Sequence, residues 1–409
     1  MERFLGVPLD TRAIPQAVLN IANKERSNLF PWNGQFSPQL VEALLAAFAQ
    51  EAKTVLDPFV GSGTVIHEAA KLGKEVFGVE INPAAFKMAQ TYRLMRLTHR
   101  ERRRVVDRVD DRLADALPDP TTLFSHGNGK SVEDVKGAVL AVQQEAGAEW
   151  EQVVIEALII LLDFYKDCTT EKVNRTWGRL RSTLLTFEHA VRPIHIVHAD
   201  ARKMPVPDGS VDFVLTSPPY INVFNYHQHY RRSAEAIGWN LLEVARAEIG
   251  SNRKHRGNRL LTVAQYCLDM AQALGEIARV CREGAHVALV VGRESNVRKT
   301  RFYNGDIVAN LAVRSLGWSF LLRQERAFMN RFGSNIFEDI LHFAVKKKPV
   351  QSSRTEPREI AGEVLTEARG RVPDEARADL EDALASLADV KPSPLFDPRA
   401  ASSTATTRK

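Results

Sequence analysis

The stretch that decides the fold is residues 54–64, TVLDPFVGSGT. Its first four residues form an apolar strand that runs into a glycine-rich loop, and a helical apolar pattern follows through Glu68 and Leu72. Residues 75–81, EVFGVEI, then have the pattern of a second strand. Strand, helix and strand in this order predict a βαβ unit with a right-handed crossover. The sequence therefore predicts an α/β fold built on a parallel sheet.

Further strands are expected downstream of this unit. Residues 195–200, 211–215 and 286–291 are short apolar runs of strand character. Residues 319–322 and 340–345 are expected to close the sheet as a hairpin, with one antiparallel strand. A helix is predicted at 263–281. Together these elements predict a doubly wound, mostly parallel sheet of the Rossmann-like kind.

The long interval between the second and third strands divides the chain. Residues 84–192 are largely helical in pattern, with the most apolar helix at 153–165. We therefore predict an α/β domain made of residues 1–100 and 193–347, and a helical insertion at 101–192. From about residue 348 the chain becomes polar and rich in Pro, Glu, Arg, Ala and Ser, so 348–409 is expected to be a mostly disordered tail with one amphipathic helix at 374–387.

Bulk composition sets only loose bounds. The 409 residues carry a net charge of +5, which permits a nucleic-acid partner without requiring one. Three widely spaced cysteines make neither a metal site nor a disulfide framework, so no metal is predicted. The N-terminus lacks the apolar core of a signal peptide, and the run 153–164 is too short and too charged to span a bilayer. We expect a soluble, cytoplasmic protein with no membrane partner.

The glycine loop indicates a nucleotide-like ligand that carries a positive charge. Gly61 and Gly63 allow a tight turn and close backbone approach, while Asp57 at the strand end can accept hydrogen bonds from a cation. A phosphate-binding loop would have Lys after its last glycine, and Thr64-Val65 stands there instead. The loop thus suits the ammonium of a methionine moiety better than a triphosphate. The alternative is a purely structural turn from strand to helix.

Two further acidic residues stand at the ends of strands. Glu80 lies about 20 residues beyond the glycine loop, a spacing at which an acid binds both hydroxyls of a ribose. Asp200 ends the next strand and could accept from an adenine amino group. The alternatives are a surface Glu before a helix and a simple helix cap, respectively.

The loop Thr216-Ser217-Pro218-Pro219-Tyr220 is the most diagnostic feature. Consecutive prolines fix the backbone and leave carbonyl groups pointing outward. We expect Ser217 and the Pro218 carbonyl to accept hydrogens from an exocyclic amino group, which frees the nitrogen lone pair, and Tyr220 to stack on the base. The Ser217 hydroxyl can both accept and donate, which would suit cytosine with its ring acceptor beside the amino group. A rigid turn followed by a buried Tyr is the alternative.

Together these strings resemble the amino-methylating DNA methyltransferases, which methylate cytosine N4 or adenine N6. The resemblance covers about 30–100 and 194–347 and implies a class I methyltransferase fold with S-adenosylmethionine as the cofactor. The Thr-Ser-Pro-Pro-Tyr form is typical of the cytosine-N4 branch. The resemblance implies catalytic roles for Ser217, Pro218, Pro219 and Tyr220. It implies cofactor contacts from Phe36, Asp57, Pro58, Phe59, Gly61, Gly63, Thr64, Glu80 and Asp200.

Double-stranded DNA with a flipped-out base is the expected partner. Aromatic and cationic residues beside the Pro-Pro loop are predicted to bind it, namely Tyr226, Tyr230, Arg231, Arg232, Arg253, Lys254 and Arg256, unless they form only a solvated basic loop. A second basic run opens the insertion, with Arg93, Arg96, Arg100, Arg102, Arg103 and Arg104, and either tracks phosphates or is a solvated helix face.

We therefore interpret the chain as a site-specific cytosine-N4 DNA methyltransferase. Adenine-N6 methylation is the nearest alternative. An RNA base methyltransferase and a catalytically inactive nucleic-acid-binding protein are the others. A restriction nuclease or another defence-system protein is the expected protein partner.

Overall fold

A computed structural model describes residues 1–117, 132–221, 226–251, 255, 257–329, 333–347 and 355–398. Its centre is a seven-stranded sheet in the order β3-β2-β1-β4-β5-β9-β8. Five neighbouring strands are parallel, and β9 runs antiparallel to both β5 and β8. The strands are β1 (Thr54–Asp57), β2 (Glu75–Glu80), β3 (Ile194–His198), β4 (Val211–Thr216), β5 (Cys281–Gly292), β8 (Ser319–Met329) and β9 (Asn335–Ala344). The predicted doubly wound sheet with its closing hairpin is confirmed.

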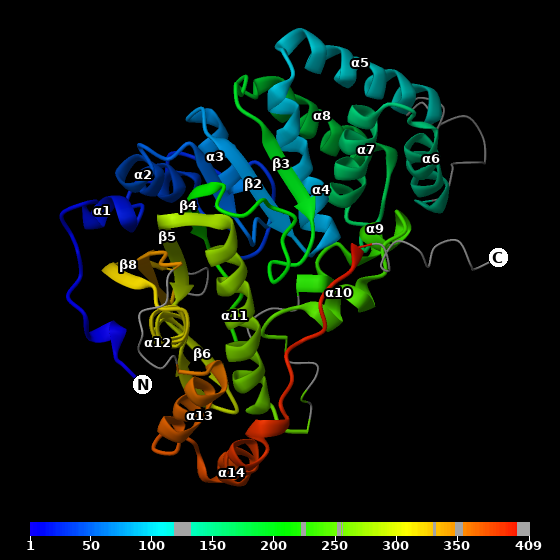
Figure 1. The fold of residues 1–409 in the computed structure, drawn as a ribbon. Helices are drawn as coiled ribbons and strands as arrows, with labels where there is room; N and C mark the ends of the chain where they lie inside the picture. Colours follow the sequence, from blue (N-terminus) through cyan, green and yellow to red (C-terminus); the bar gives the residue numbers. More distant parts are fainter. Residues whose placement is uncertain are drawn as a thin grey trace.

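Helices cover both faces of this sheet because its strands bury side chains on both sides (Figure 1). Along β1, Val55 belongs to one apolar cluster and Leu56 to the other. The first cluster includes residues of α2 (Pro38–Phe48), α3 (Thr64–Lys71) and α4 (Pro83–Gln90). The second includes residues of α11 (Leu261–Val280) and α12 (Asn304–Asn310). The protein is thus a three-layer α/β/α sandwich.

Short elements complete the description. A separate two-stranded ribbon is formed by β6 (Glu294–Val297) and β7 (Thr300–Tyr303). The short helices are α1 (Gln16–Leu19), α9 (Arg231–Ala236) and α10 (Leu241–Ala247). Among the helices within the described ranges, none is both long and apolar enough to cross a membrane.

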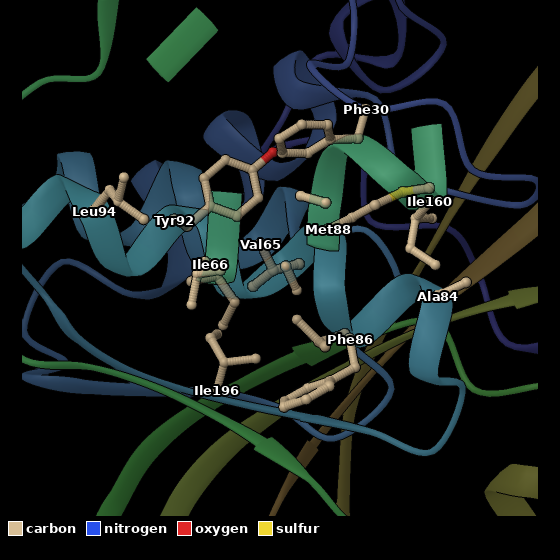
Figure 2. Close-up of a cluster of buried hydrophobic side chains, with 14 of the residues drawn as sticks. Phe30, Val65, Ile66, Ala84, Phe86, Met88, Tyr92, Leu94, Ile160 and Ile196 are labelled. Atoms are coloured by element: carbon tan, nitrogen blue, oxygen red, sulfur yellow. The ribbon is translucent and has the colours of Figure 1, made fainter. Parts of the chain in front are cut away.

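The predicted insertion is helical and lies to one side of the sheet (Figure 1). It consists of α5 (His99–Ala116), α6 (Val132–Glu145), α7 (Glu149–Leu162) and α8 (Thr170–Thr186). Its central helix, α7, packs against α4, α5, α6 and α8. Figure 2 shows Ile160 of α7 near Met88 of α4, in the cluster that also includes Val65 of α3, so the insertion extends the apolar layer on this face of the sheet.

The prediction of a mostly disordered tail is wrong for residues 355–398. Two helices form there, α13 (Pro357–Ala368) and α14 (Arg377–Ala385), and the second lies within the predicted amphipathic helix. Ile360, Val364 and Ala368 recur at helical spacing and are fully buried in the second apolar cluster. The polar composition of the tail hid this stripe, which burial against α11 stabilises. Residues 348–354 and 399–409 lie outside the described ranges.

Candidate active site

The predicted site residues meet at one edge of the sheet, beyond the carboxyl ends of β1, β2, β3 and β4. A cavity of about 1000 Å³, including the space at its open mouth, lies there. Its lining includes Asp57 after β1, Glu80 at the end of β2, Asp200 after β3 and Ser217 after β4. The glycine loop and the Pro-Pro loop therefore face one cavity. This is where open parallel sheets place their ligands.

Asp57 is a buried carboxyl held by the loop after β4. Its Oδ1 accepts from the Thr216 hydroxyl at 2.6 Å and from the Phe59 amide at 3.1 Å. Burial raises the pKa of Asp57 to about 7, against the lowering effect of these two hydrogen bonds. The ionised carboxylate is thus poorly stabilised by the protein alone, and a cation placed beside it would stabilise it. Thr216 directly precedes Ser217 and is fully buried. Its hydrogen bond therefore holds the loop that carries Ser217 next to Asp57.

Glu80 is held in a comparable way by the glycine loop. One carboxylate oxygen accepts from the Gly61 amide at 2.8 Å and the other from the Asn82 amide at 2.7 Å. Burial raises the pKa of Glu80 to about 7, and the charge of Asp57 adds to this. Each oxygen keeps acceptor capacity toward the cavity, as binding of two adjacent hydroxyls requires.

The glycines of the loop are required by close neighbours as well as by their backbone conformation. Gly63 has φ +95°, and a Cβ there would lie 2.5 Å from the Tyr92 ring. Gly61 has φ +52°, and a Cβ there would lie 3.3 Å from Trp32. At Gly63 both conditions exclude a side chain, and at Gly61 the positive φ disfavours one while Trp32 leaves little room for it. Trp32 thus lies directly over the loop.

The N-terminal segment forms the opposite wall of the cavity. Phe36 is buried and lines the cavity with Gln35, whose side chain accepts from Ser62 at 2.7 Å. Asn28 donates to the Phe36 carbonyl at 2.6 Å and to the Thr64 hydroxyl at 3.0 Å. Pro58 and Phe59 also line the cavity. Gly63 does not line it and instead packs on Tyr92. Apart from Gly63, the predicted cofactor residues therefore surround one space.

The charged side chains that line the cavity among the described residues are acidic. Four carboxyl groups line the cavity, those of Asp57, Glu80, Asp200 and Glu248, and no Lys or Arg does so among the described residues. A ligand with phosphate groups would meet unfavourable charge there, whereas a ligand with ammonium or sulfonium charge would be attracted. Within the described ranges, no group of three or more His, Cys, Asp or Glu side chains forms a metal site.

Asp200 has different partners from those expected. Its carboxylate accepts from the Arg202 backbone amide, from the Arg202 guanidinium through both oxygens, and from the Phe396 amide of the C-terminal segment at 3.0 Å. These four hydrogen bonds use both oxygens. A contact with an adenine amino group would have to displace one of them, so that role stays a prediction.

The Pro-Pro loop presents only part of itself to the cavity. Ser217 and Pro219 line it, whereas Pro218 is buried and Tyr220 is not in the lining. The Tyr220 hydroxyl lies 3.0 Å from the Ser217 hydroxyl. Stacking of Tyr220 on a base therefore stays a prediction, and its hydroxyl contacts Ser217 in this structure.

The aromatic residues predicted to bind nucleic acid divide between two cavities. Tyr226 lines the cavity beside Glu80 and stacks near Trp32, with 6.3 Å between ring centroids. Tyr230 and Arg231 line a second cavity, which shares Trp32, Asn33 and Gln35 with the first. Arg232 lies over the exposed Tyr165 ring, 4.4 Å from its centroid. Arg253, Lys254 and Arg256 lie outside the described residues.

The basic run that opens the insertion does not form one continuous positive face. Arg102 is buried and donates to the Phe187 carbonyl, while Arg93 pairs with Glu149 and Arg96 donates to the Ala190 carbonyl. Each of the three thus has a partner within the protein, although Arg96 is exposed and Arg93 and Glu149 form a surface ion pair. Arg100, Arg103 and Arg104 are exposed as well.

Sequence reasoning missed several residues of the site. Trp32, Asn82 and Glu248 line the cavity, and Thr216 holds Asp57. Asn82 had a visible signal, because an Asn before Pro83 is a typical helix cap, and its side chain caps α4. Glu248 lies far from the motifs, and only the fold brings it to the cavity, where it accepts from His227 at 2.6 Å.

Comparison with known proteins supports the resemblance over part of the chain. Residues 14–91 match the N6/N4 methylase family, described as DNA methylase. The type II methyltransferase M.MjaII of Methanocaldococcus jannaschii is 34% identical over 67 residues. That alignment covers 15% of this chain, and the chain spans only 13% of the length of that relative. The resemblance predicted from the motifs is thus confirmed for the segment that holds the glycine loop and Glu80.

Solved structures with a similar arrangement include a SAM-dependent methyltransferase from Methanosarcina mazei, 12% identical, with a TM-score of 0.34, covering 75% of this chain and 98% of that one. Another is the rRNA methyltransferase AviRa from Streptomyces viridochromogenes, 13% identical, with a TM-score of 0.30, covering 82% and 93%. At these scores the comparison adds nothing to the fold that the strand order establishes.

Proposed function

We propose that this chain, which matches the N6/N4 DNA methylases over residues 14–91, methylates an exocyclic amino group of a DNA base with S-adenosylmethionine as the methyl donor. The observation that carries the proposal is the hydrogen bond of 2.6 Å from Thr216 to Asp57. This hydrogen bond joins the glycine loop, which carries the Asp57 carboxyl, to the Pro-Pro loop, which carries Ser217. One cavity thus has a wall for a cationic cofactor and a wall for an amino group.

The cofactor side of the proposal rests on charge and on close approach. Asp57 accepts from the ammonium of the methionine moiety, and Glu80 accepts from the ribose hydroxyls. Both carboxyls have raised pKa values, near 7, in the ligand-free protein, so a positively charged ligand favours their ionised forms. Phe36 and Phe59 supply apolar wall, and Gly61 lets the backbone approach the ligand. The bound cofactor supplies a methyl group on a sulfonium, which is already activated for transfer.

The substrate side rests on the Pro-Pro loop. An exocyclic amino group is a poor nucleophile because its lone pair is delocalised into the ring. Hydrogen bonds accepted by Ser217 and by the Pro218 carbonyl would draw its hydrogens aside and favour a tetrahedral nitrogen. With this nitrogen in line with the methyl group, its lone pair would form a bond to the methyl carbon while the carbon–sulfur bond breaks and the neutral thioether leaves. The methylated nitrogen would then lose one proton to solvent, and no covalent enzyme intermediate is needed. A base inside a duplex cannot reach Ser217, so the base is flipped out.

Cytosine N4 is the proposed position, because the loop has Thr216-Ser217 where adenine-N6 enzymes typically have an acid or Asn before the prolines. Adenine N6 is the second candidate, since adenine also presents an amino group beside a ring acceptor. Tyr230 and Arg231 at the second cavity, and Arg232 on Tyr165, support contact with the nucleic acid by stacking and by charge.

The test is to incubate the purified protein with the cofactor and with DNA or RNA in separate reactions, and to analyse the digested nucleosides by mass spectrometry. N4-methylcytosine from DNA is expected, and Ser217→Ala serves as the inactive control. Finding only N6-methyladenine would change the base, and methylation of RNA alone would change the substrate. Cofactor binding without any methylation would favour a nucleic-acid-binding protein that lacks catalysis.

A further inference from the structure

The ring of Tyr220 lies in the space that a side chain at Gly292 would fill. A Cβ built on Gly292 would lie 2.9 Å from Cε2 of Tyr220 and 3.2 Å from Cδ2 and Cζ. Gly292 ends β5 and is the register partner of Glu338 on β9. Directly opposed residues of an antiparallel pair project to the same face of the sheet. Glycine at 292 therefore brings the Tyr220 ring beside the Glu338 side chain.

A chain of polar groups results from this packing. The Ser217 and Tyr220 hydroxyl oxygens are 3.0 Å apart, and either can be the donor. The Glu338 carboxyl lies close enough to Tyr220 for each group to shift the pKa of the other. Burial raises the pKa of the Tyr220 phenol far above its ordinary value, so this hydroxyl keeps its single proton. The three groups form a row that leads from Ser217 at the cavity through Tyr220 to Glu338.

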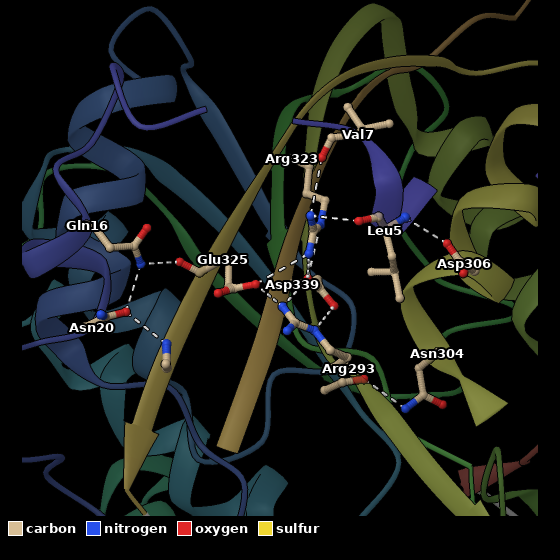
Figure 3. A network of polar contacts seen from close by, with 12 residues as sticks. Leu5, Val7, Gln16, Asn20, Arg293, Asn304, Asp306, Arg323, Glu325 and Asp339 are labelled. Atoms are coloured by element: carbon tan, nitrogen blue, oxygen red, sulfur yellow. Dashed lines mark hydrogen bonds and ion pairs between the residues drawn. The ribbon is translucent and has the colours of Figure 1, made fainter. Parts of the chain in front are cut away.

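The surroundings of Glu338 decide which way the hydrogen bonds run. The carboxyl is ion-paired with Arg326, its register partner on β8, at 3.3 Å. The pKa of Glu338 lies above its ordinary value because of burial, although Arg326 and Tyr220 act in the opposite direction. Asp339 projects to the other face of β9 and has its own cations, Arg293 and Arg323, as Figure 3 shows. When it is ionised and paired with Arg326, the Glu338 carboxylate can only accept hydrogen bonds, whereas its protonated form can also donate one.

The number of hydroxyl protons decides which group donates and which accepts in this row of hydrogen bonds. Tyr220 has one hydroxyl proton, and an ionised Glu338 beside it can only accept that proton in a hydrogen bond. The Tyr220 oxygen can then only accept from the Ser217 hydroxyl, so the Ser217 proton points away from the cavity. Ser217 is left with its lone pairs free toward a substrate.

We propose that Glu338, ionised beside Arg326, accepts a hydrogen bond from Tyr220 and is a positioning residue: through Tyr220 it orients the Ser217 hydroxyl so that it only accepts a hydrogen bond from the amino group of the target base. This inference rests on the proposed function. It differs from the expectation drawn from sequence, in which Ser217 both accepts and donates. The proposal also explains why residue 292 is glycine, because a larger residue there would displace the Tyr220 ring and separate its hydroxyl from Ser217 and Glu338.

A double-mutant cycle of Glu338→Gln and Tyr220→Phe tests the proposal. The Gln amide can donate as well as accept, so Tyr220 is no longer forced to donate, while Phe keeps the ring on Gly292 and removes the hydroxyl. We expect Glu338→Gln to lower kcat about ten- to a hundred-fold, the scale of one charge-assisted hydrogen bond, with unchanged affinity for S-adenosylmethionine. In the Tyr220→Phe background the same change should lower kcat no further. Glu294→Gln on the exposed ribbon strand β6 is the matched control.

The outcomes separate this inference from the proposed function. A further loss of kcat in the Tyr220→Phe background would mean that Glu338 acts through general stability, and would overturn the inference. Wild-type turnover in Glu338→Gln would overturn it as well. In both cases the wild-type protein still methylates DNA. A wild-type protein that binds S-adenosylmethionine and methylates no nucleic acid would instead overturn the proposed function.

Discussion

Replacing Asp57 by Asn should stabilise the ligand-free protein at pH 8 and should weaken its binding of the cofactor. Asn has nearly the same shape, and its side-chain oxygen can still accept from Thr216 and from the Phe59 amide. What the change removes is a carboxylate that is fully desolvated in the cavity floor. A buried charge of this kind costs stability in return for binding a cation.

The magnitude follows from the pKa of Asp57, which burial raises from 3.8 to about 7. The folded state binds the proton more tightly than the unfolded state, so the free energy of unfolding falls as the pH rises from about 4 to about 7. Above pH 7 the full cost applies, on the order of 4 kcal/mol. The Asn amide has donors of its own that are left without partners, which costs about 1–3 kcal/mol. A net gain of about 1–3 kcal/mol is expected at pH 8.

The assay is urea unfolding of wild type and Asp57→Asn at pH 8 and at pH 5, together with calorimetry of S-adenosylmethionine binding at pH 8. At pH 5 the wild-type carboxyl is already protonated, so the gain should vanish there. Asp115→Asn, an exposed change on α5, is the matched control and should alter neither property. A variant that is equally destabilised at both pH values, or that binds the cofactor as tightly as wild type, would refute the reasoning.

Three other changes probe separate parts of the site. Glu80→Ala should weaken cofactor binding by about 1.5–3 kcal/mol, the scale of charge-assisted hydrogen bonds, and unchanged affinity in calorimetry would remove Glu80 from the ribose site. Gly292→Ala should reduce the rate of methyl transfer while leaving cofactor affinity intact, because the added methyl group displaces Tyr220; a wild-type rate would show that the ring position does not matter. Phe396→Ala should destabilise the protein by about 3–5 kcal/mol, since Phe396 is buried against His198, and should expose the C-terminal segment to limited proteolysis; a segment that stays protected would contradict its predicted anchoring.

The order of elements was predictable because the apolar runs and the glycine loop are local signals. β1 was predicted at its observed bounds, and β2 to within one residue. The positions of Asp57, Glu80 and Ser217 beside the cavity were predictable for the same reason, since each residue stands where an apolar strand ends. The carboxyl ends of parallel strands meet at one edge, so their meeting in one cavity followed from the fold.

What the sequence did not predict depends on long-range packing. The donors on Asp200 include an amide of residue 396, nearly two hundred residues away. Glu338 reaches Tyr220 only because β9 lies beside β5 and Gly292 has no side chain. Helix α13 was not predicted because the polar composition of the tail masks the helical spacing of Ile360, Val364 and Ala368.

The most direct test of the account is to follow a deuterated methyl group from S-adenosylmethionine to the nucleosides of duplex DNA treated with the purified protein. The account predicts that the label appears on an exocyclic amino nitrogen, as N4-methylcytosine, and that Ser217→Ala abolishes its appearance while still binding the cofactor. Label on a ring carbon, or none in DNA despite bound cofactor, would contradict the account.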